Sequence, residues 1–167
     1  MHKSPKNIHF KHLANTELFL LNHFLKNNKE PKIGKGDLAY CLLKSSNQDS
    51  RSSSTHTIIG SARLIPQTIE NKKVFWLRGV FIHPEYRGKG LGTLLIQRLH
   101  QSAKKEIGSF TIYAFPIQHL KGFYTHLGYE VLSMESYHKM PSQLQMRFKS
   151  AQQQGKNWLC MCFETNK

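Results

Sequence analysis

Glycine and basic residues alternate in one short segment, Arg87-Gly88-Lys89-Gly90-Leu91-Gly92. Glycine lacks a Cβ atom and tolerates positive φ, so consecutive N–H groups in such a turn can converge on one anion. A helix that begins at the end of the turn adds its own unpaired N–H groups and the positive end of its dipole. Arg87 and Lys89 add two full charges. The segment therefore predicts a cradle for a phosphate or pyrophosphate group.

Two other phosphate-binding glycine patterns do not fit this segment. The P-loop pattern, in which Gly-Lys is followed by Ser or Thr, is absent. The dinucleotide pattern needs a third glycine where this chain has Thr93 or Leu95, depending on the starting glycine. The remaining alternative is a structural turn that has cations beside it by chance.

The charge of the chain is consistent with an anionic partner. The 167 residues include 24 Lys and Arg against 10 Asp and Glu, a formal net charge of +14. Half of this excess lies in residues 71–128, which contain the glycine-rich turn. A phosphate-rich small molecule, a nucleic acid and an anionic membrane would all suit such a charge. The length suits a single domain over residues 1–167, with residues 148–167 as a C-terminal extension that docks as a strand.

Targeting signals and cysteine usage favour the cytoplasm. The basic N-terminal residues are followed by no apolar run long enough for a secretory leader or a spanning helix, and we expect no membrane partner. Cys41, Cys160 and Cys162 are odd in number and lack a disulfide framework, which favours reduced thiols. The pair Cys160-x-Cys162 has no second ligand pair, so we expect no metal.

Apolar periodicity places the glycine-rich turn between a strand and a helix. A strand is predicted over Lys73–Ile82, and Gly79 in its interior marks a bulge or a close approach by another group. A helix with one apolar face follows from about Gly90 to Lys105. Two more helices are predicted, from Asn15 to about Asn28 and over His119–Leu127. Further strands are predicted over Ile8–His12, Asp37–Lys44, His56–Gln67, Ser109–Ala114, Tyr129–Leu132 and Gln143–Lys149. This order of elements predicts a mixed α/β sheet.

The segment from Ile82 to Gly92, IHPEYRGKGLG, resembles motif A of the GNAT superfamily of acyl-CoA-dependent N-acetyltransferases. The resemblance implies the GNAT fold, a mixed sheet of about six to seven strands that is splayed at the central strand and flanked by about four helices. It also implies acetyl-CoA as co-substrate. The backbone of Val80, Phe81 and Ile82 would pair with the pantetheine amides. The pyrophosphate would be held by the N–H groups of Arg87, Gly88, Lys89, Gly90, Leu91 and Gly92.

Phe123-Tyr124, followed by Gly128-Tyr129, resembles motif B of the same superfamily. By this resemblance Tyr124 is the general acid that protonates the CoA thiolate. The chemistry agrees, because a leaving thiolate of pKa about 8.5 benefits from a nearby weak acid such as a phenol of pKa about 10. The alternative is a Tyr124 that only packs under its helix. His119 could cap that helix, contact CoA or act in catalysis.

A general base is harder to find. An ammonium acceptor must lose its proton before it can attack, yet residues 71–84 contain no carboxylate. Glu70 and Glu85 flank the central strand, and His83 lies in the turn after it. Three possibilities stay open: a base that acts through water, an acceptor amine of low pKa, and an acceptor that is not an amine.

We therefore predict an N-acetyltransferase in which an unidentified amine attacks acetyl-CoA directly in a ternary complex. One alternative is a CoA-binding module without catalysis. Another is acetylation of a nucleic-acid-linked acceptor such as aminoacyl-tRNA, which is not favoured because no RNA-recognition signature is present. Cationic acceptors would be repelled by the basic central block. The protein is expected to be a monomer or a homodimer.

Overall fold

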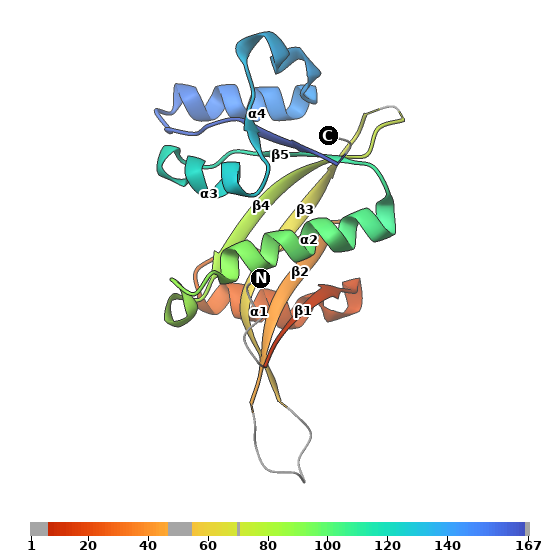
Figure 1. Ribbon diagram of the computed structural model, residues 1–167, viewed down its shortest axis with the longest axis vertical. Coiled ribbons are helices and arrows are strands. Elements are labelled where there is room, and N and C mark those ends of the chain that lie inside the picture. The colour runs from red at the N-terminus through yellow and green to blue at the C-terminus, as the bar shows by residue number, and fades with distance from the viewer. Residues whose placement is uncertain (1–6, 47–54, 70, 166–167) are drawn as a thin grey trace. The chain divides into compact units, whose positions relative to one another are not determined.

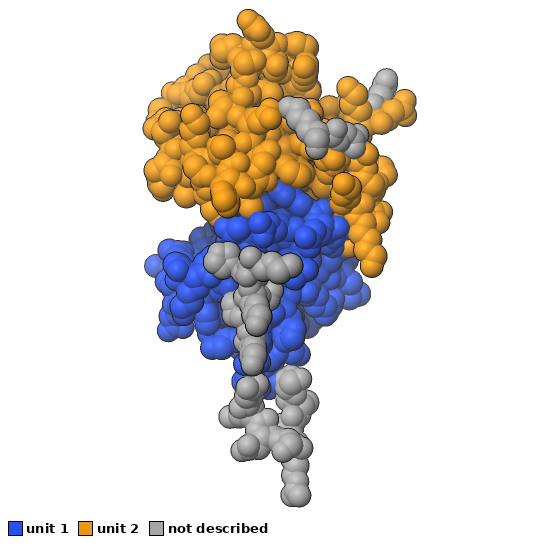
Figure 2. All heavy atoms as spheres, viewed as in Figure 1, with its two compact units in different colours: residues 1–63, 79–102 blue, residues 64–78, 103–167 orange. Residues whose placement is uncertain are grey.

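The computed structural model describes residues 7–46, 55–69 and 71–165 (Figure 1). Glu70, one of the candidate bases, lies outside these residues. The described strands form a seven-stranded sheet with the hydrogen-bonded order β1-β2-β3-β4-β5-β7-β6. The chain divides into two compact units (Figure 2). Unit 1 contains residues 1–63 and 79–102, and unit 2 contains residues 64–78 and 103–167.

Unit 1 is built around the N-terminal strands and the first helix. Its elements are β1 (Ile8–Leu13), η1 (Asn15–Glu17), α1 (Leu18–Asn27), β2 (Leu38–Ser45), the first part of β3 (His56–Gln67), the last part of β4 (Val74–Ile82), η2 (Pro84–Tyr86) and most of α2 (Leu91–Ile107). β1 pairs antiparallel with β2, with Ile8 opposite Lys44. The buried face of α1, formed by Leu18, Leu21 and Leu25, packs in one core with residues of β1 and β2.

Unit 2 contains the C-terminal half of the chain. Its elements are the remaining parts of β3, β4 and α2, followed by β5 (Thr111–Ala114), η3 (Gln118–Leu120), α3 (Lys121–His126), β6 (Glu130–Val131), η4 (Met134–Lys139), α4 (Ser142–Gln153) and β7 (Met161–Glu164). β5 pairs parallel with β4 over Val74–Leu77. β7 pairs antiparallel with both β5 and β6. The C-terminal residues therefore contribute a strand to the interior of the sheet order.

The prediction of a mixed α/β sheet is confirmed. Parallel and antiparallel pairs occur in the same sheet, and the described residues contain four α-helices. β3 begins and ends where the sequence predicted, at His56 and Gln67. The splay of the sheet at its central strand stays a prediction.

The prediction of a strand at Gln143–Lys149 is wrong, because this segment lies in α4. Leu144, Met146 and Phe148 alternate as in a strand, but Met146 is 69% exposed whereas Leu144 and Phe148 are buried. The buried residues Leu144, Phe148 and Ala151 follow the spacing of a helix, i, i+4 and i+7. Leu144 and Phe148 pack α4 against Val74 and Trp76 of β4. Tertiary packing against β4 decides between the two periodicities.

Replacing Leu144 by Ala tests whether α4 is docked through this face. Leu144 is fully buried, and we expect Leu144→Ala to lower the free energy of unfolding by about 2–5 kcal/mol. Met146→Ala on the same helix is the matched control, with an expected change within about 0.5 kcal/mol. Urea denaturation followed by circular dichroism measures both. Equal effects of the two substitutions would show that this face of α4 is not buried.

Candidate functional site

The backbone of β4 changes character at Gly79. Val74–Leu77 are buried and pair with β5, whereas Val80–Ile82 are only partly buried. Gly79 has φ +59°, a conformation that costs a residue with a Cβ atom about 1–2 kcal/mol. The predicted irregularity at Gly79 is therefore present as a left-handed residue inside the strand. Beyond it, three apolar residues keep part of their surface accessible.

β3 holds the last residues of β4 at close range. A Cβ atom on Gly60 would lie 2.6 Å from Ile82 Cδ1 and 3.0 Å from the Phe81 carbonyl oxygen, so a larger residue there would require the Ile82 side chain and the end of β4 to shift. The N–H group of His83 donates to the Ile59 carbonyl oxygen at 2.8 Å. These contacts fix where the chain leaves β4 and enters the glycine-rich turn.

The turn from Arg87 to Gly92 leaves a series of N–H groups without intramolecular acceptors. Gly88 and Gly90 have φ of +73° and +71°. The first N–H group used by α2 is that of Leu94, which donates to the Gly90 carbonyl oxygen at 3.1 Å. Within the described part of the chain, no hydrogen bond uses the N–H groups of Gly88 to Thr93. Such a run of donors at a helix N-terminus suits a phosphate group.

The two cationic side chains of this turn donate hydrogen bonds to main-chain oxygens of the residues just before it. Arg87 Nε donates to the Ile82 carbonyl oxygen at 2.8 Å, and Lys89 Nζ donates to the Glu85 carbonyl oxygen at 3.2 Å. The Lys89 ammonium also lies 5.5 Å from the centre of the Tyr86 ring. Sequence reasoning missed a third cation, Lys44 of β2, which lies 5.1 Å from the same ring. The contact pairs residues 42 positions apart, and no local pattern indicates it.

The candidate bases near the turn interact with each other. His83 Nδ1 lies 3.8 Å from Glu85 Oε2 and is buried without a hydrogen-bond partner among the described residues. The His83 ring packs against Phe24 of α1 and Tyr86. Glu85 is exposed, and its carboxylate lies beside His83; among the described residues it forms no ion pair with Arg87 or Lys89. The positive charge at the turn is therefore not neutralised by this carboxylate.

Tyr124 is buried on α3 in unit 2, with 7% of its surface exposed. Its ring makes edge contacts with Phe123 and Tyr129, at centroid distances of 5.1 and 5.3 Å. Burial raises the pKa of the Tyr124 phenol to about 12. The phenol is therefore protonated, and able to donate, throughout the physiological pH range.

His119 lies in the 3₁₀ turn η3 and is exposed. It does not cap α3, because the residue at the N-cap is Leu120 and no side chain provides a capping hydrogen bond. The prediction of a capping role is therefore wrong. Contact with CoA stays a prediction.

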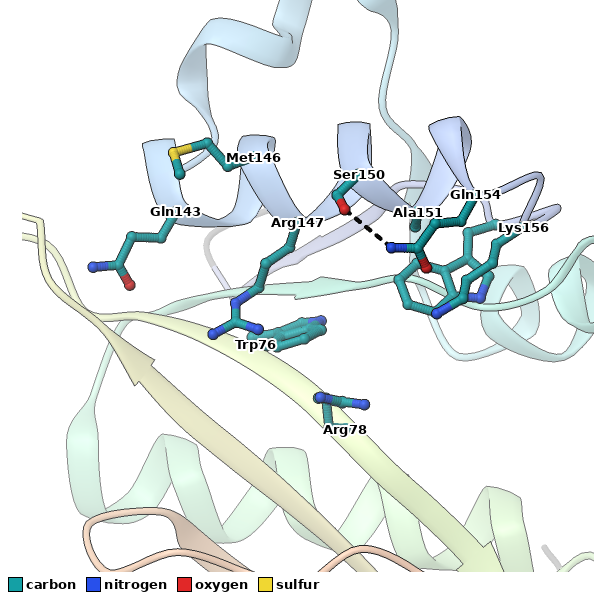
Figure 3. Close-up of a pocket in the computed structure, with 10 residues that line it drawn as sticks. Trp76, Arg78, Gln143, Met146, Arg147, Ser150, Ala151, Gln154 and Lys156 are labelled. Atoms are coloured by element: carbon teal, nitrogen blue, oxygen red, sulfur yellow. Dashed lines mark hydrogen bonds between the residues drawn. The ribbon is translucent and has the colours of Figure 1, made fainter.

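Unit 2 also contains a pocket of about 470 Å³ that sequence reasoning missed (Figure 3). Residues of β4, of α4 and of the turn after α4 line it. Because α4 was predicted as a strand, its polar face could not be assigned to a pocket. The apolar residues Leu144, Phe148 and Ala151 have the i, i+4, i+7 spacing of a helix, and this spacing could have indicated α4 from the sequence.

A comparison with protein families finds a match over residues 49–131 to the acetyltransferase (GNAT) domain. This segment of the chain belongs to the GNAT family. The matched range contains the glycine-rich turn and Tyr124, the two features on which the resemblance was based.

Relatives of this GNAT chain agree with the assignment. An uncharacterized N-acetyltransferase, ycf52, from Gracilaria tenuistipitata var. liui is 36% identical over 73 residues, which are 43% of this chain and 37% of that protein. The N-acetylglutamate synthase from Neisseria gonorrhoeae, solved with coenzyme A and N-acetyl-glutamate, has a TM-score of 0.61 at 11% identity. That match covers 98% of this chain and 36% of the synthase. An acyl-CoA N-acyltransferase from Pseudomonas aeruginosa has a TM-score of 0.54 at 17% identity, over 94% and 98% of the two chains. The chain thus spans little more than a third of the length of the first two relatives.

Two further properties of the GNAT chain concern membranes and metals. None of the helices in the described residues is long and apolar enough to cross a membrane. In the same residues, no three His, Cys, Asp or Glu side chains gather as a metal site would require.

Gly90→Ala tests whether the turn binds an anion through its backbone. The new Cβ atom would meet no atom within 4 Å, so the change acts on the positive φ alone. We expect the free energy of unfolding to fall by about 1 kcal/mol and the affinity for CoA to fall about tenfold or more. Isothermal titration calorimetry measures the affinity.

Gly36→Ala is the matched control. Gly36 also has positive φ, +92°, with no atom within 4 Å of a new Cβ atom, and it lies outside the turn. The control should lose similar stability and keep its affinity for CoA. Equal affinities of the two variants would show that the turn does not bind CoA through its backbone.

Proposed function

We propose that this chain transfers the acetyl group of acetyl-CoA to an amine. The observation that carries the proposal is the glycine-rich turn, with its run of N–H donors and two anchored cations. Membership of the GNAT family supports acetyl transfer. Two solved structures of one protein of similar fold, the N-acetylglutamate synthase from Neisseria gonorrhoeae, contain coenzyme A, which supports CoA as the carrier.

Three groups of residues would bind acetyl-CoA. The N–H groups from Gly88 to Gly92 would hold the pyrophosphate, because they can donate several hydrogen bonds to one anion. The predicted Arg87 N–H group is not available for this, because it donates to the Pro84 carbonyl oxygen at 3.2 Å. The partly buried residues Val80–Ile82 would lie along the pantetheine and pair with its amides as an added strand does. His119, which is exposed on η3, stays a proposed contact of the cofactor.

The reaction would proceed by direct attack. The neutral nitrogen of the acceptor forms a bond to the thioester carbonyl carbon, and the bond from that carbon to sulfur then breaks. The nitrogen loses one proton, and the sulfur leaves as a thiolate that must gain one. The products are the N-acetylated acceptor and CoA with a free thiol.

Tyr124 would supply the proton to the sulfur. A general acid must be protonated at the working pH, and the pKa of about 12 keeps the Tyr124 phenol in that form. The phenolate that results regains a proton from solvent. Because the required form is lost only as the pH rises through about 12, Tyr124 should cause no fall in rate between neutral pH and pH 10.

The acceptor would reach the site as the neutral amine or lose its proton to water. Described residues 71–84 include no carboxylate, and Glu85 is directed toward His83. The rate should therefore rise with pH in step with the pKa of the acceptor itself. This dependence also favours acceptors whose amine has a low pKa.

Tyr124→Phe removes only the hydroxyl group. We expect kcat for release of free CoA thiol to fall about 100-fold while the affinity for acetyl-CoA is kept. A thiol-release assay over a panel of amines, amino acids, peptides and aminoacyl-tRNA measures turnover. Acetyl-CoA binding with no thiol release for any acceptor would contradict transfer and leave a CoA-binding module.

Tyr137→Phe is the matched control for this experiment. Burial also raises the pKa of the Tyr137 phenol to about 12, and Tyr137 lies in η4, outside motif B. Loss of the Tyr137 hydroxyl group should not change turnover. Unchanged turnover in Tyr124→Phe would exclude Tyr124 as the acid.

A further inference from the structure

Among the residues that the structure describes, three cationic side chains and no acidic side chain line the pocket of unit 2. The cationic residues are Arg78, Arg147 and Lys156. The neutral polar side chains at its wall are Gln143, Ser150 and Gln154. Like charges held around one cavity repel each other, and an anion that enters the cavity relieves this repulsion. The volume of about 470 Å³ falls within the range of small-molecule sites, about 300–1,000 Å³.

Two tryptophans hold the cations in place. The guanidinium groups of Arg78 and Arg147 lie 4.5 and 5.3 Å from the centre of the Trp76 ring. Figure 3 shows Arg147 extending from α4 toward this ring, with Arg78 on β4 beside it. The Lys156 ammonium lies 4.9 Å from the Trp158 ring. The Arg147 guanidinium stacks on the Trp76 ring, and in this position the N–H groups at its edge can donate to a carboxylate or phosphate.

The aromatic floor of the pocket is rigid. Trp76 is buried, and Phe115 contacts both Trp76 and Trp158, at centroid distances of 5.5 and 6.1 Å. Phe148 of α4 lies 5.1 Å from Phe115 and belongs to the same core. The positions of the two indole rings are thus set by the packing of unit 2 before any ligand binds, which lowers the entropic cost of binding against them.

The pocket is joined through the backbone to the segment that begins the helix of Tyr124. Trp158 pairs with Ile117 in an antiparallel bridge. The Leu159 N–H group donates to the Pro116 carbonyl oxygen at 2.7 Å, and the Gln118 N–H group donates to the Asn157 carbonyl oxygen at 3.2 Å. Residue 118 begins η3, which leads directly into α3. Backbone hydrogen bonds therefore join residues 157–159, at the wall of the pocket, to residues 116–118, which lead into the helix that carries Tyr124.

We infer that this pocket binds a small molecule through a carboxylate or phosphate group. Taken with the proposed function, on which this step rests, the ligand is the acceptor, and its class is an amine that carries an anionic group. The three cations select for that group, and the indole rings contact the rest of the molecule. This assignment predicts that amino acids and phosphorylated amines are better acceptors than the corresponding uncharged amides.

Tryptophan fluorescence reports on the pocket directly, because the only two tryptophans of the chain, Trp76 and Trp158, both line it. We propose titration with succinate and with inorganic phosphate, and with succinamide as the uncharged analogue, at constant ionic strength. The expected result is a saturable change with an anion and none with succinamide. The succinate and phosphate arms distinguish a carboxylate ligand from a phosphate ligand.

Arg147→Gln and Lys149→Gln are the matched variants. Both side chains are exposed on α4 and both substitutions remove one positive charge, but only Arg147 lines the pocket. We expect Arg147→Gln to weaken anion binding about tenfold or more and Lys149→Gln to leave it unchanged. Absence of a saturable change with either anion, or equal binding by the two variants, would overturn the inference.

Titration calorimetry with acetyl-CoA separates failure of this inference from failure of the proposed function. Binding and turnover of acetyl-CoA without an anion response in fluorescence would overturn the pocket assignment alone. An anion response that is lost in Arg147→Gln, without acetyl-CoA binding, would support the pocket and contradict the acetyltransferase. Competition between CoA and succinate for the fluorescence change would assign the pocket to CoA phosphates and so overturn its role as an acceptor site.

Discussion

The positive φ of Gly79 is the constraint on which both candidate sites depend. Before it, β4 is buried, pairs with β5 and contributes Trp76 to the floor of the unit 2 pocket. After it, β4 continues as three partly buried apolar residues that lead into the glycine-rich turn. The division of the chain into units falls between Arg78 and Gly79. A residue with a Cβ atom at position 79 would be strained in this conformation by about 1–2 kcal/mol, so one glycine allows one strand to serve two different environments.

Local sequence patterns predicted the phosphate-binding turn well because its properties are local. The turn combines Gly88 and Gly90 with the neighbouring cations Arg87 and Lys89, and an apolar helix follows directly. The backbone has positive φ at both glycines, as glycine permits. α2 was predicted for a similar reason, since it has a long and consistent apolar period. The fold class followed from the order of these elements.

The features that sequence reasoning missed depend on contacts between distant residues. Leu144, Met146 and Phe148 fit the period of a strand and that of a helix, and only packing against Val74 and Trp76 decides for the helix. Lys44 of β2 lies over the Tyr86 ring of η2, far away in the sequence. The pocket combines Trp76 with Arg147 and Lys156, which are 71 and 80 positions later in the chain. No periodicity within one segment predicts such a combination.

The net charge of +14 divides into parts with different chemistry. At the turn, Arg87 and Lys89 are bonded to main-chain oxygens and lie beside a series of N–H donors, an arrangement suited to a pyrophosphate. In unit 2, Arg147 and Lys156 lie over indole rings, an arrangement suited to a planar anion on a small organic molecule. Neither of these two clusters requires a nucleic acid as its ligand.

The most direct test of the account is whether acetyl-CoA binds to and stabilises the folded chain. A ligand that binds only the folded state at about 100 times its Kd raises the free energy of unfolding by about 2.7 kcal/mol. The account predicts this increase in urea denaturation with acetyl-CoA at that excess over a Kd measured by calorimetry. No heat of binding and no shift of the unfolding midpoint at millimolar acetyl-CoA would contradict it.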